Sequence, residues 1–372
     1  MLLVAFVFSY LVIALFAFYS VVSDAVPKVK PSIQVLGLVW FMAMCVFFIV
    51  FRSYDTLGDT SVYVNEIFSE IGKSPSLSSY NTQALDTAEP LFYWLTKLGY
   101  ITGSSRVYLL LAMMAFIGPL MVSIFLQWRS HFFLVLFSFV SLFVFYSLSM
   151  NIIRNGISVG WWLLGLVMLY QRRWIALSIC VFISVGFHFS SLFFWVLVLL
   201  ALVVRNIYVI AILGLVALVA AFLEFDLSEL LLVASDSGLA NELIGMKLAR
   251  YGNKVFDAEY NTGFRADFVI FNLFFLALAL WYKQVLNYKN HFYDFLVRLY
   301  IILSAIFFLS FQIPGADRIG ILSWIIIPFI SMFPIHEPPL RNNIHWKLTL
   351  FCITVIQGLV SIYIIKHLFQ IS

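Results

Sequence analysis

Met-Asn-Ile-Ile-Arg-Asn-Gly-Ile-Ser, residues 150–158, joins two long apolar runs, residues 132–149 and 157–170, and carries one cation, Arg154. The chain is 63% apolar and only 11% charged, so an Arg between two such runs stands out. If the runs cross a membrane, a buried Arg costs roughly 2.5–3.5 kcal/mol at mid-bilayer and less near the interface. Residues of that cost are usually kept for a function. We expect Arg154 to hold a phosphate, with the rest of the chain forming the walls of its site.

The composition places the chain outside the range of soluble domains. Its mean hydropathy is +1.02 and its aromatic content is 18%. Apolar runs near 20 residues recur along the whole length, and each is long enough to cross about 30 Å of hydrocarbon. We therefore predict an all-α polytopic membrane protein that forms a single integral membrane domain, residues 1–372. About twelve spans are expected, at residues 2–22, 33–51, 107–127, 132–149, 157–170, 174–187, 190–204, 207–223, 266–282, 298–313, 319–333 and 348–365.

Charge and cysteine content exclude several classes of protein. The net charge of +4 is small and spread along the chain, which argues against binding of nucleic acid. Cys45, Cys180 and Cys352 each lie inside an apolar run, so we expect packed side chains, not disulfides or metal ligands. No basic residue precedes the first run, so we expect no cleaved signal peptide.

The distribution of Lys and Arg predicts the orientation. If the N-terminus faces outward, the inward connections hold eleven of the 22 cations and the short outward segments hold three. Positive charges favour the cytoplasmic side, so we expect the N-terminus to face outward. Two long loops, residues 52–106 and 224–265, are then extracytoplasmic.

Both long loops are expected to carry short amphipathic helices that lie on the membrane surface as a lid. In the first loop, Asp59 is placed to cap a helix that runs through Ile71. Glu89-Pro90 is typical of a second helix start, with Pro at the first helical position. Leu91, Trp94, Leu95 and Leu98 then share one face. The second loop has two such pieces, near residues 227–233 and 241–251.

Polar residues that loop solvation does not readily explain gather on the predicted outer side. They come from five separate segments and are mostly cationic, which indicates a membrane-level pocket for an anionic ligand. They are Arg52, Asp55, Asp59, Arg154, His188, Lys247, Arg250, Asp317 and Arg318.

Each cation also has a purely structural interpretation. Arg154 could extend its side chain to the interface without binding any ligand. Arg318 could pair only with Asp317 in a tight turn. Lys247 and Arg250 could anchor lipid headgroups.

The same holds for the acids and the histidine. His188 could be an interfacial histidine with satisfied hydrogen bonds, although an imidazole there is also suited to proton transfer. Asp59 could serve only as a helix cap, and Asp55 only as the ion-pair partner of Arg52. Glu89 could be only a pre-proline turn residue.

Several chemistries lack support in the sequence. It has no Gly-rich phosphate loop or dinucleotide fingerprint, and no Cys/His cluster with metal-ligand spacing. It also lacks an Asp-x-Asp pair and a Ser nucleophile in an elbow motif. We therefore expect no cofactor and no metal. The remaining chemistry uses Arg and Lys to stabilise a phosphate leaving group, with a carboxylate or His accepting a proton.

Six short motifs, taken in order over residues 50–320, resemble the EpsG family of Wzy-type polysaccharide polymerases. They depart from the family pattern at Asn155, where Gln is usual, and at Asp317 before the last Arg. The motifs are Gly58-Asp59-Thr60 with Tyr63, Glu89-Pro90-Leu91-Phe92, Ile153-Arg154-Asn155-Gly156, Phe187-His188-Phe189-Ser190-Ser191, Lys247-Leu248-Ala249-Arg250-Tyr251 and Asp317-Arg318-Ile319-Gly320.

The resemblance implies a multi-span, metal-independent glycosyltransferase of the GT-C-like kind. Its substrate would be a polyprenyl-pyrophosphate-linked oligosaccharide at the outer face of the bacterial cytoplasmic (inner) membrane, and a chain-length regulator would be a partner. His188 or Asp59 would be the base that activates the acceptor hydroxyl. The residues expected to bind pyrophosphate or glycan are Arg52, Tyr63, Glu89, Arg154, Lys247, Arg250, Tyr251 and Arg318.

Two other functions stay open at this point. One is another polyprenyl-phosphate-dependent glycosyltransferase or an O-antigen-ligase-like enzyme, whose product would carry a single sugar or a lipid A acceptor. The other is a flippase or transporter of lipid-linked oligosaccharides. Transporters usually place polar residues at mid-bilayer in repeated halves. Here the polar residues lie on one predicted side and the chain has no repeat.

Overall fold

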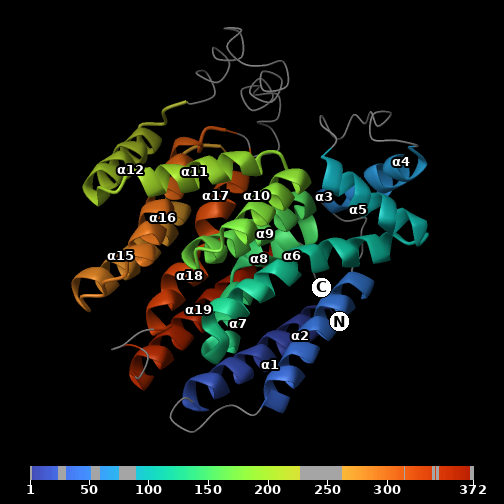
Figure 1. Ribbon diagram of the computed structural model, residues 1–372, viewed down its shortest axis with the longest axis horizontal. Helices are drawn as coiled ribbons and strands as arrows, with labels where there is room; N and C mark the ends of the chain where they lie inside the picture. Colours follow the sequence, from blue (N-terminus) through green and yellow to red (C-terminus); the bar gives the residue numbers. More distant parts are fainter. Residues whose placement is uncertain are drawn as a thin grey trace. The chain divides into compact units, whose positions relative to one another are not determined.

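The computed structural model describes residues 2–23, 31–51, 59–74, 89–226, 262–313, 315–336, 340 and 343–368. All regular secondary structure in these ranges is helical (Figure 1), which confirms the all-α fold class. Five residues predicted in the pocket or site, Arg52, Asp55, Lys247, Arg250 and Tyr251, lie outside the described residues. The two helical pieces predicted in the second loop also lie outside them.

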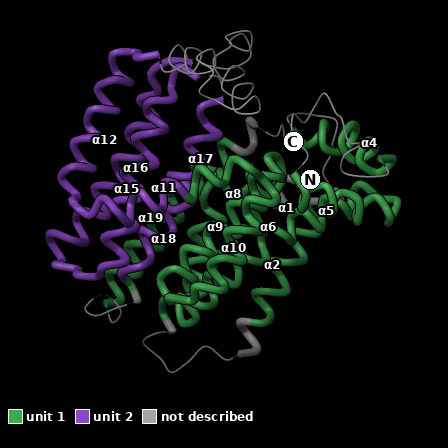
Figure 2. Tube along the Cα trace, turned by 45° about the horizontal axis from the view of Figure 1, so that its top comes forward, with its two compact units in different colours: residues 1–195, 335–372 green, residues 196–334 purple. Residues whose placement is uncertain are grey.

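The chain divides into two compact units, which Figure 2 distinguishes by colour. The first comprises Met1–Trp195 and Ile335–Ser372. Its helices are α1 (Leu2–Ser23), α2 (Pro31–Phe51), α3 (Asp59–Val62), α4 (Phe68–Lys73), α5 (Pro90–Ile101), α6 (Ser105–Trp128), α7 (Phe132–Val140), α8 (Phe143–Tyr146), α9 (Ile153–Tyr170), α10 (Trp174–Phe187) and α19 (Ile344–Leu368).

Helix α9 is the centre of the first unit, because it packs along both α6 and α10. The α6–α9 approach is close at Gly160, where an added Cβ would lie 2.6 Å from the carbonyl oxygen of Phe116. A small residue lets two helices pack with their backbones near each other. Helix α5 rests on α4 and α6 and also contacts α10, so the first long loop is joined to the spans.

The second unit, Val196–Pro334, packs α12 against α16 and α16 against α17. Its core contains a polar cluster in which Asn272 Oδ1 accepts hydrogen bonds from Tyr300 at 3.3 Å and Ser304 at 3.1 Å. The pairing satisfies polar groups that would be costly to bury alone. The helices are α12 (Ile207–Phe222), α15 (Ala266–Gln284), α16 (His291–Leu309), α17 (Asp317–Ile325) and α18 (Ile327–Met332), with α11 (Ser191–Val203) beginning before the boundary between the units.

Four predicted segments differ from the observed helices, and one of them, residues 319–333, is divided into α17 and α18. The run at residues 132–149 is broken into α7, α8 and a π-helical turn, Ser147–Asn151. Helix α9 begins at Ile153, not at 157, so Arg154 lies inside a helix. Helix α16 begins at His291, not at 298, because the Asn290 side chain caps it by accepting from the backbone nitrogens of Phe292 and Tyr293.

The predicted membrane character is supported by length and composition. Among the described residues, five helical stretches are long and apolar enough to cross a membrane, and five more apolar helices are shorter. The number of spans, predicted as twelve, and the single membrane domain stay predictions. The five long stretches are Ser105–Val140, Ala266–Gln284, His291–Leu309, Asp317–Ile335 and Ile344–Ile364.

Candidate functional site

The helix predicted in the first long loop is present, but Asp59 is its first helical residue, not its cap, and it continues to Lys73 through a π-helical turn, Tyr63–Ile67. It is fixed to the turn before α9 by Thr60, whose buried hydroxyl donates a 2.6 Å hydrogen bond to the carbonyl of Met150. Turns of this π type occur often at functional sites. Here one carries Tyr63 and the other precedes Arg154.

Glu89 ends the first loop and begins α5. It is the N-cap residue, Pro90 stands at the first helical position, and the helix start agrees with the prediction. The Glu89 carboxylate does not cap its own helix. Its side chain is only 1% exposed and both of its oxygens are directed at other segments of the chain. Glu89 is therefore a buried acid whose carboxylate binds residues that are distant in the sequence.

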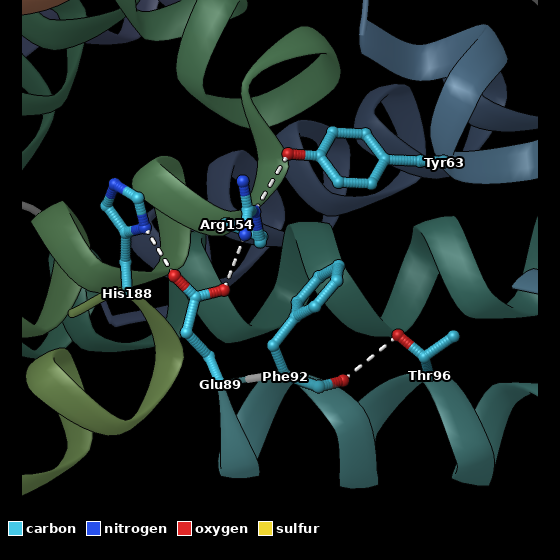
Figure 3. Close-up of polar contacts among 6 residues, drawn as sticks. All are labelled: Tyr63, Glu89, Phe92, Thr96, Arg154 and His188. Carbon is cyan, nitrogen blue, oxygen red and sulfur yellow. Dashed lines mark hydrogen bonds and ion pairs between the residues drawn. The ribbon is translucent and has the colours of Figure 1, made fainter. Parts of the chain in front are cut away.

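Arg154 lies in the first turn of α9 and binds three groups (Figure 3). Its guanidinium forms a 2.6 Å ion pair with Oε2 of Glu89, and its Nε donates to the hydroxyl of Tyr63 at 3.3 Å. The guanidinium carbon also lies 5.9 Å from the ring centre of Phe92, within the range of a cation–π contact. One fifth of the side chain, 21%, is exposed, so the cation is held firmly and still reached from outside.

His188 occupies the residue directly after α10. Its Nδ1 lies 2.9 Å from Oε1 of Glu89, and its side chain is 19% exposed. An ionised carboxylate can only accept a hydrogen bond, so Nδ1 carries the proton in this contact. The basic nitrogen of the neutral ring is then Nε2.

The site favours an ionised Glu89. Burial by itself would raise the pKa of this carboxyl, but the hydrogen bond from His188 and the charge of Arg154 outweigh it and lower the pKa below its usual value of 4.5. Burial raises the pKa of Tyr63, so its phenol is neutral at ordinary pH. The charged core of the site is thus one buried anion between a cation and an imidazole.

Comparison with known proteins identifies the family. The family model described as the EpsG family matches residues 35–370. The chain belongs to the EpsG family. This is the family of Wzy-type polysaccharide polymerases, so the resemblance that the six motifs indicated is confirmed. No curated protein and no solved structure matches the chain.

Three EpsG-like motifs that are distant in sequence meet at this site. The Glu89-Pro90 motif, the Ile153-Arg154 motif and the Phe187-His188 motif contribute one charged or titratable side chain each, and Tyr63 comes from a fourth. The sequence did not indicate Phe92 as an Arg154 contact. Nor did it indicate that Glu89 joins the other two, although an acid before Pro on the predicted outer side was a signal.

The other predicted site residues are placed as follows. Asp59 stands in the first turn of α3 and is near enough to Tyr63 to act on it electrostatically. Arg318 is the second residue of α17, in the second unit. Within the described ranges, no three His, Cys, Asp or Glu residues are grouped so as to hold a metal ion.

Proposed function

We propose that this EpsG-family protein polymerises polyprenyl-pyrophosphate-linked oligosaccharide repeats into a cell-surface polysaccharide. The reaction would take place at the outer face of the cytoplasmic membrane and would need no metal. The observation that carries the proposal is the meeting of Arg154 and His188 on Glu89, because it offers a fixed cation and a proton acceptor side by side.

The cation suits a pyrophosphate leaving group. A guanidinium presents several N–H donors in a planar fork that matches phosphate oxygens. Arg154 uses NH1 for Glu89 and Nε for Tyr63, and its partly exposed side chain could receive phosphate oxygens at its remaining donor positions. The sequence also predicts Arg318, Lys247 and Arg250 as pyrophosphate-binding residues, and for these three the role stays a prediction.

The transfer itself needs a base for the acceptor hydroxyl. In the proposed reaction a sugar hydroxyl of one lipid-linked repeat attacks the anomeric carbon of another, and the bond from that carbon to pyrophosphate breaks. The carbon inverts, the proton goes to the base, and the negative charge collects on the leaving pyrophosphate beside Arg154. His188 and Asp59 are the two candidate bases. Arg52, Glu89 and Tyr251 stay candidates for contacts with phosphate or sugar.

The test is reconstitution of the purified protein in vesicles with its lipid-linked repeat unit and EDTA. Wild type is expected to give a ladder of lengthening glycan. Arg154→Lys is expected to lower the rate, because an ammonium keeps the charge and loses the fork. Ser178→Ala, on an exposed part of α10, is the control and should match wild type.

Other outcomes would replace the proposal. A product with one added sugar, or with a lipid A acceptor, would identify another glycosyltransferase or a ligase. Movement of intact lipid-linked oligosaccharide across the bilayer without a ladder would identify a transporter.

A further inference from the structure

We propose that His188 is the base of the transfer, acting through Nε2, and that Glu89 is the positioning residue that holds His188 in the tautomer it needs. This inference rests on the proposed function. It assigns Glu89 a role other than substrate contact and decides between the two candidate bases.

Glu89 is buried more deeply than its two partners, which indicates that it acts through them. Its side chain is 1% exposed, whereas those of Arg154 and His188 are 21% and 19% exposed. A substrate that enters from outside meets the cation and the imidazole before it meets the acid. One oxygen of Glu89 binds each of the two, so the acid acts on the reaction through them.

The backbone around this contact is held in place from both sides. Leu91, two residues after Glu89, packs on Gly186, two residues before His188, so closely that an added Cβ on Gly186 would lie 2.7 Å from the Leu91 side chain. The start of α5 is also fixed by Pro90 and by the hydrogen bond from Tyr93 nitrogen to the Glu89 carbonyl, 2.9 Å. The carboxylate therefore meets the imidazole with little freedom to move.

The chemistry follows from the hydrogen-bond direction. Glu89 accepts from Nδ1–H, so the lone pair of the neutral ring is on Nε2. As the acceptor oxygen bonds to the anomeric carbon, its proton passes to Nε2 and the carbon–pyrophosphate bond breaks with its electron pair on the leaving oxygen. The imidazolium that forms is stabilised by the adjacent anion, and its proton then returns to solvent. A carboxylate plays this orienting role towards the histidine of serine hydrolases.

Glu89→Gln tests the role with almost no change in shape. Of the two polar atoms of the new amide, only the oxygen can accept from Arg154 at the position that Oε2 now holds, so the amide nitrogen turns to His188. To accept from that nitrogen the ring must carry its proton on Nε2, where it cannot act as a base. Arg154 keeps a partner in this variant, and donor binding should survive.

The experiment measures glycan formation by wild type, Glu89→Gln, Glu89→Asp and His188→Gln, with Glu70→Gln as the matched acid-to-amide control on an exposed residue. Glu89→Gln should lose about 10²–10⁴-fold in kcat, the usual contribution of a general base. Its KM for the lipid-linked donor should change by less than about threefold, and so should binding of inorganic pyrophosphate. Glu89→Asp should recover part of the rate because it keeps an anion.

The pH profile supplies a readout that a structural role would not change. In the described part of the chain, the ring contacts Glu89, the N-cap residue of α5, and Glu89 contacts Arg154 on α9; Tyr63 on the π-helical turn binds Arg154, and Asp59 on α3 acts electrostatically on Tyr63. Wild type should lose activity as acid protonates the imidazole. Glu89→Gln removes the neighbouring anion that favours the charged imidazole, so this loss of activity at acid pH should begin at a lower pH than in the wild type.

Two results would overturn the inference. Suppose that the wild type forms the glycan ladder and that Glu89→Gln has the same kcat and loses activity at the same acid pH. Glu89 then does not position the base. The proposed function would then still stand. If wild type forms no glycan ladder at all, the proposed function fails, and the inference fails with it.

Discussion

Oε1 of Glu89 lies 2.9 Å from Nδ1 of His188, although 99 residues separate the two in the chain. The other carboxylate oxygen binds Arg154 at 2.6 Å, so neither oxygen is left to the apolar interior. A buried acid needs this pairing, because an uncompensated charge in a low-dielectric site is strongly destabilising. The same arrangement that makes the acid tolerable also aligns the cation and the imidazole.

The stability of the fold should depend on the ionisation of Glu89. Its pKa is lowered below 4.5, against the effect of burial, by His188 and Arg154. A carboxyl with a lowered pKa contributes stability that is complete above its unfolded value and is lost as pH falls through the folded value. We expect the Tm of the wild type in detergent to fall at pH below about 4.5, and this part of the fall to be absent from Glu89→Gln.

Thermal unfolding across pH 3–7 is the measurement for this prediction. Glu70→Gln, on an exposed acid of α4, is the control and should follow wild type. Parallel curves for Glu89→Gln and wild type at acid pH would contradict the prediction.

Arg154 and Glu89 should be strongly coupled in stability. Arg154→Met leaves the Glu89 carboxylate, 1% exposed, without its cation, and breaking a buried pair costs about 3–5 kcal/mol. Because Arg154 itself is 21% exposed, we expect a value at the lower end. Adding Glu89→Gln removes the stranded charge, so the double variant should be more stable than Arg154→Met alone. A double-mutant cycle by thermal unfolding measures the coupling, and additive effects would refute it.

Most helices follow directly from the sequence. Apolar runs bounded by polar or turn residues gave α10 its observed ends, Trp174 and Phe187, and most other helix ends within a few residues. The predicted start of a helix was wrong where a local hydrogen bond determines it. The charged start of α16 was assigned to a connection, whereas Asn290 caps it and Asp294 binds Lys283 at 2.7 Å.

The apolar face predicted for α5 packs inside the protein only in part: Leu91 lies against Gly186, whereas two other residues of the face are largely exposed. Trp94 is 63% exposed and Leu98 is 53% exposed, whereas Phe92 and Tyr93 on the other side are buried. In a membrane protein an apolar face can be covered by lipid, so hydrophobicity alone does not locate the core.

The site was only partly predictable for a related reason. A sequence shows that Glu89, Arg154 and His188 are unusual in apolar surroundings. Which of them share a hydrogen bond depends on how α5, α9 and α10 pack, and no local pattern contains that information.

Thr60 should fix the helix that carries Asp59 and Tyr63. Its buried hydroxyl donates to the Met150 carbonyl at 2.6 Å, and Thr60→Val leaves that carbonyl without this donor. We expect a loss of about 1–2 kcal/mol in stability and faster amide hydrogen exchange over residues 59–73. Thr96→Val is the matched control. Thr96 is equally buried, but its hydroxyl donates to the Phe92 carbonyl inside one helix, so its loss should leave exchange over residues 59–73 unchanged.

Gly156, two residues after Arg154, should tolerate no side chain. A Cβ at this position would collide with the carbonyl oxygen of Leu148, which is backbone in the preceding π-helical turn and cannot rotate away. We expect Gly156→Ala to cost about 1–3 kcal/mol and to reduce glycan formation, because the turn must shift and Arg154 with it. Gly118→Ala is the control, since nothing lies within 4 Å of its added Cβ on α6. If Gly156→Ala kept wild-type Tm and activity, the tight turn would not be what places Arg154 against Glu89, and the Arg-Asn-Gly order of the motif would need another explanation.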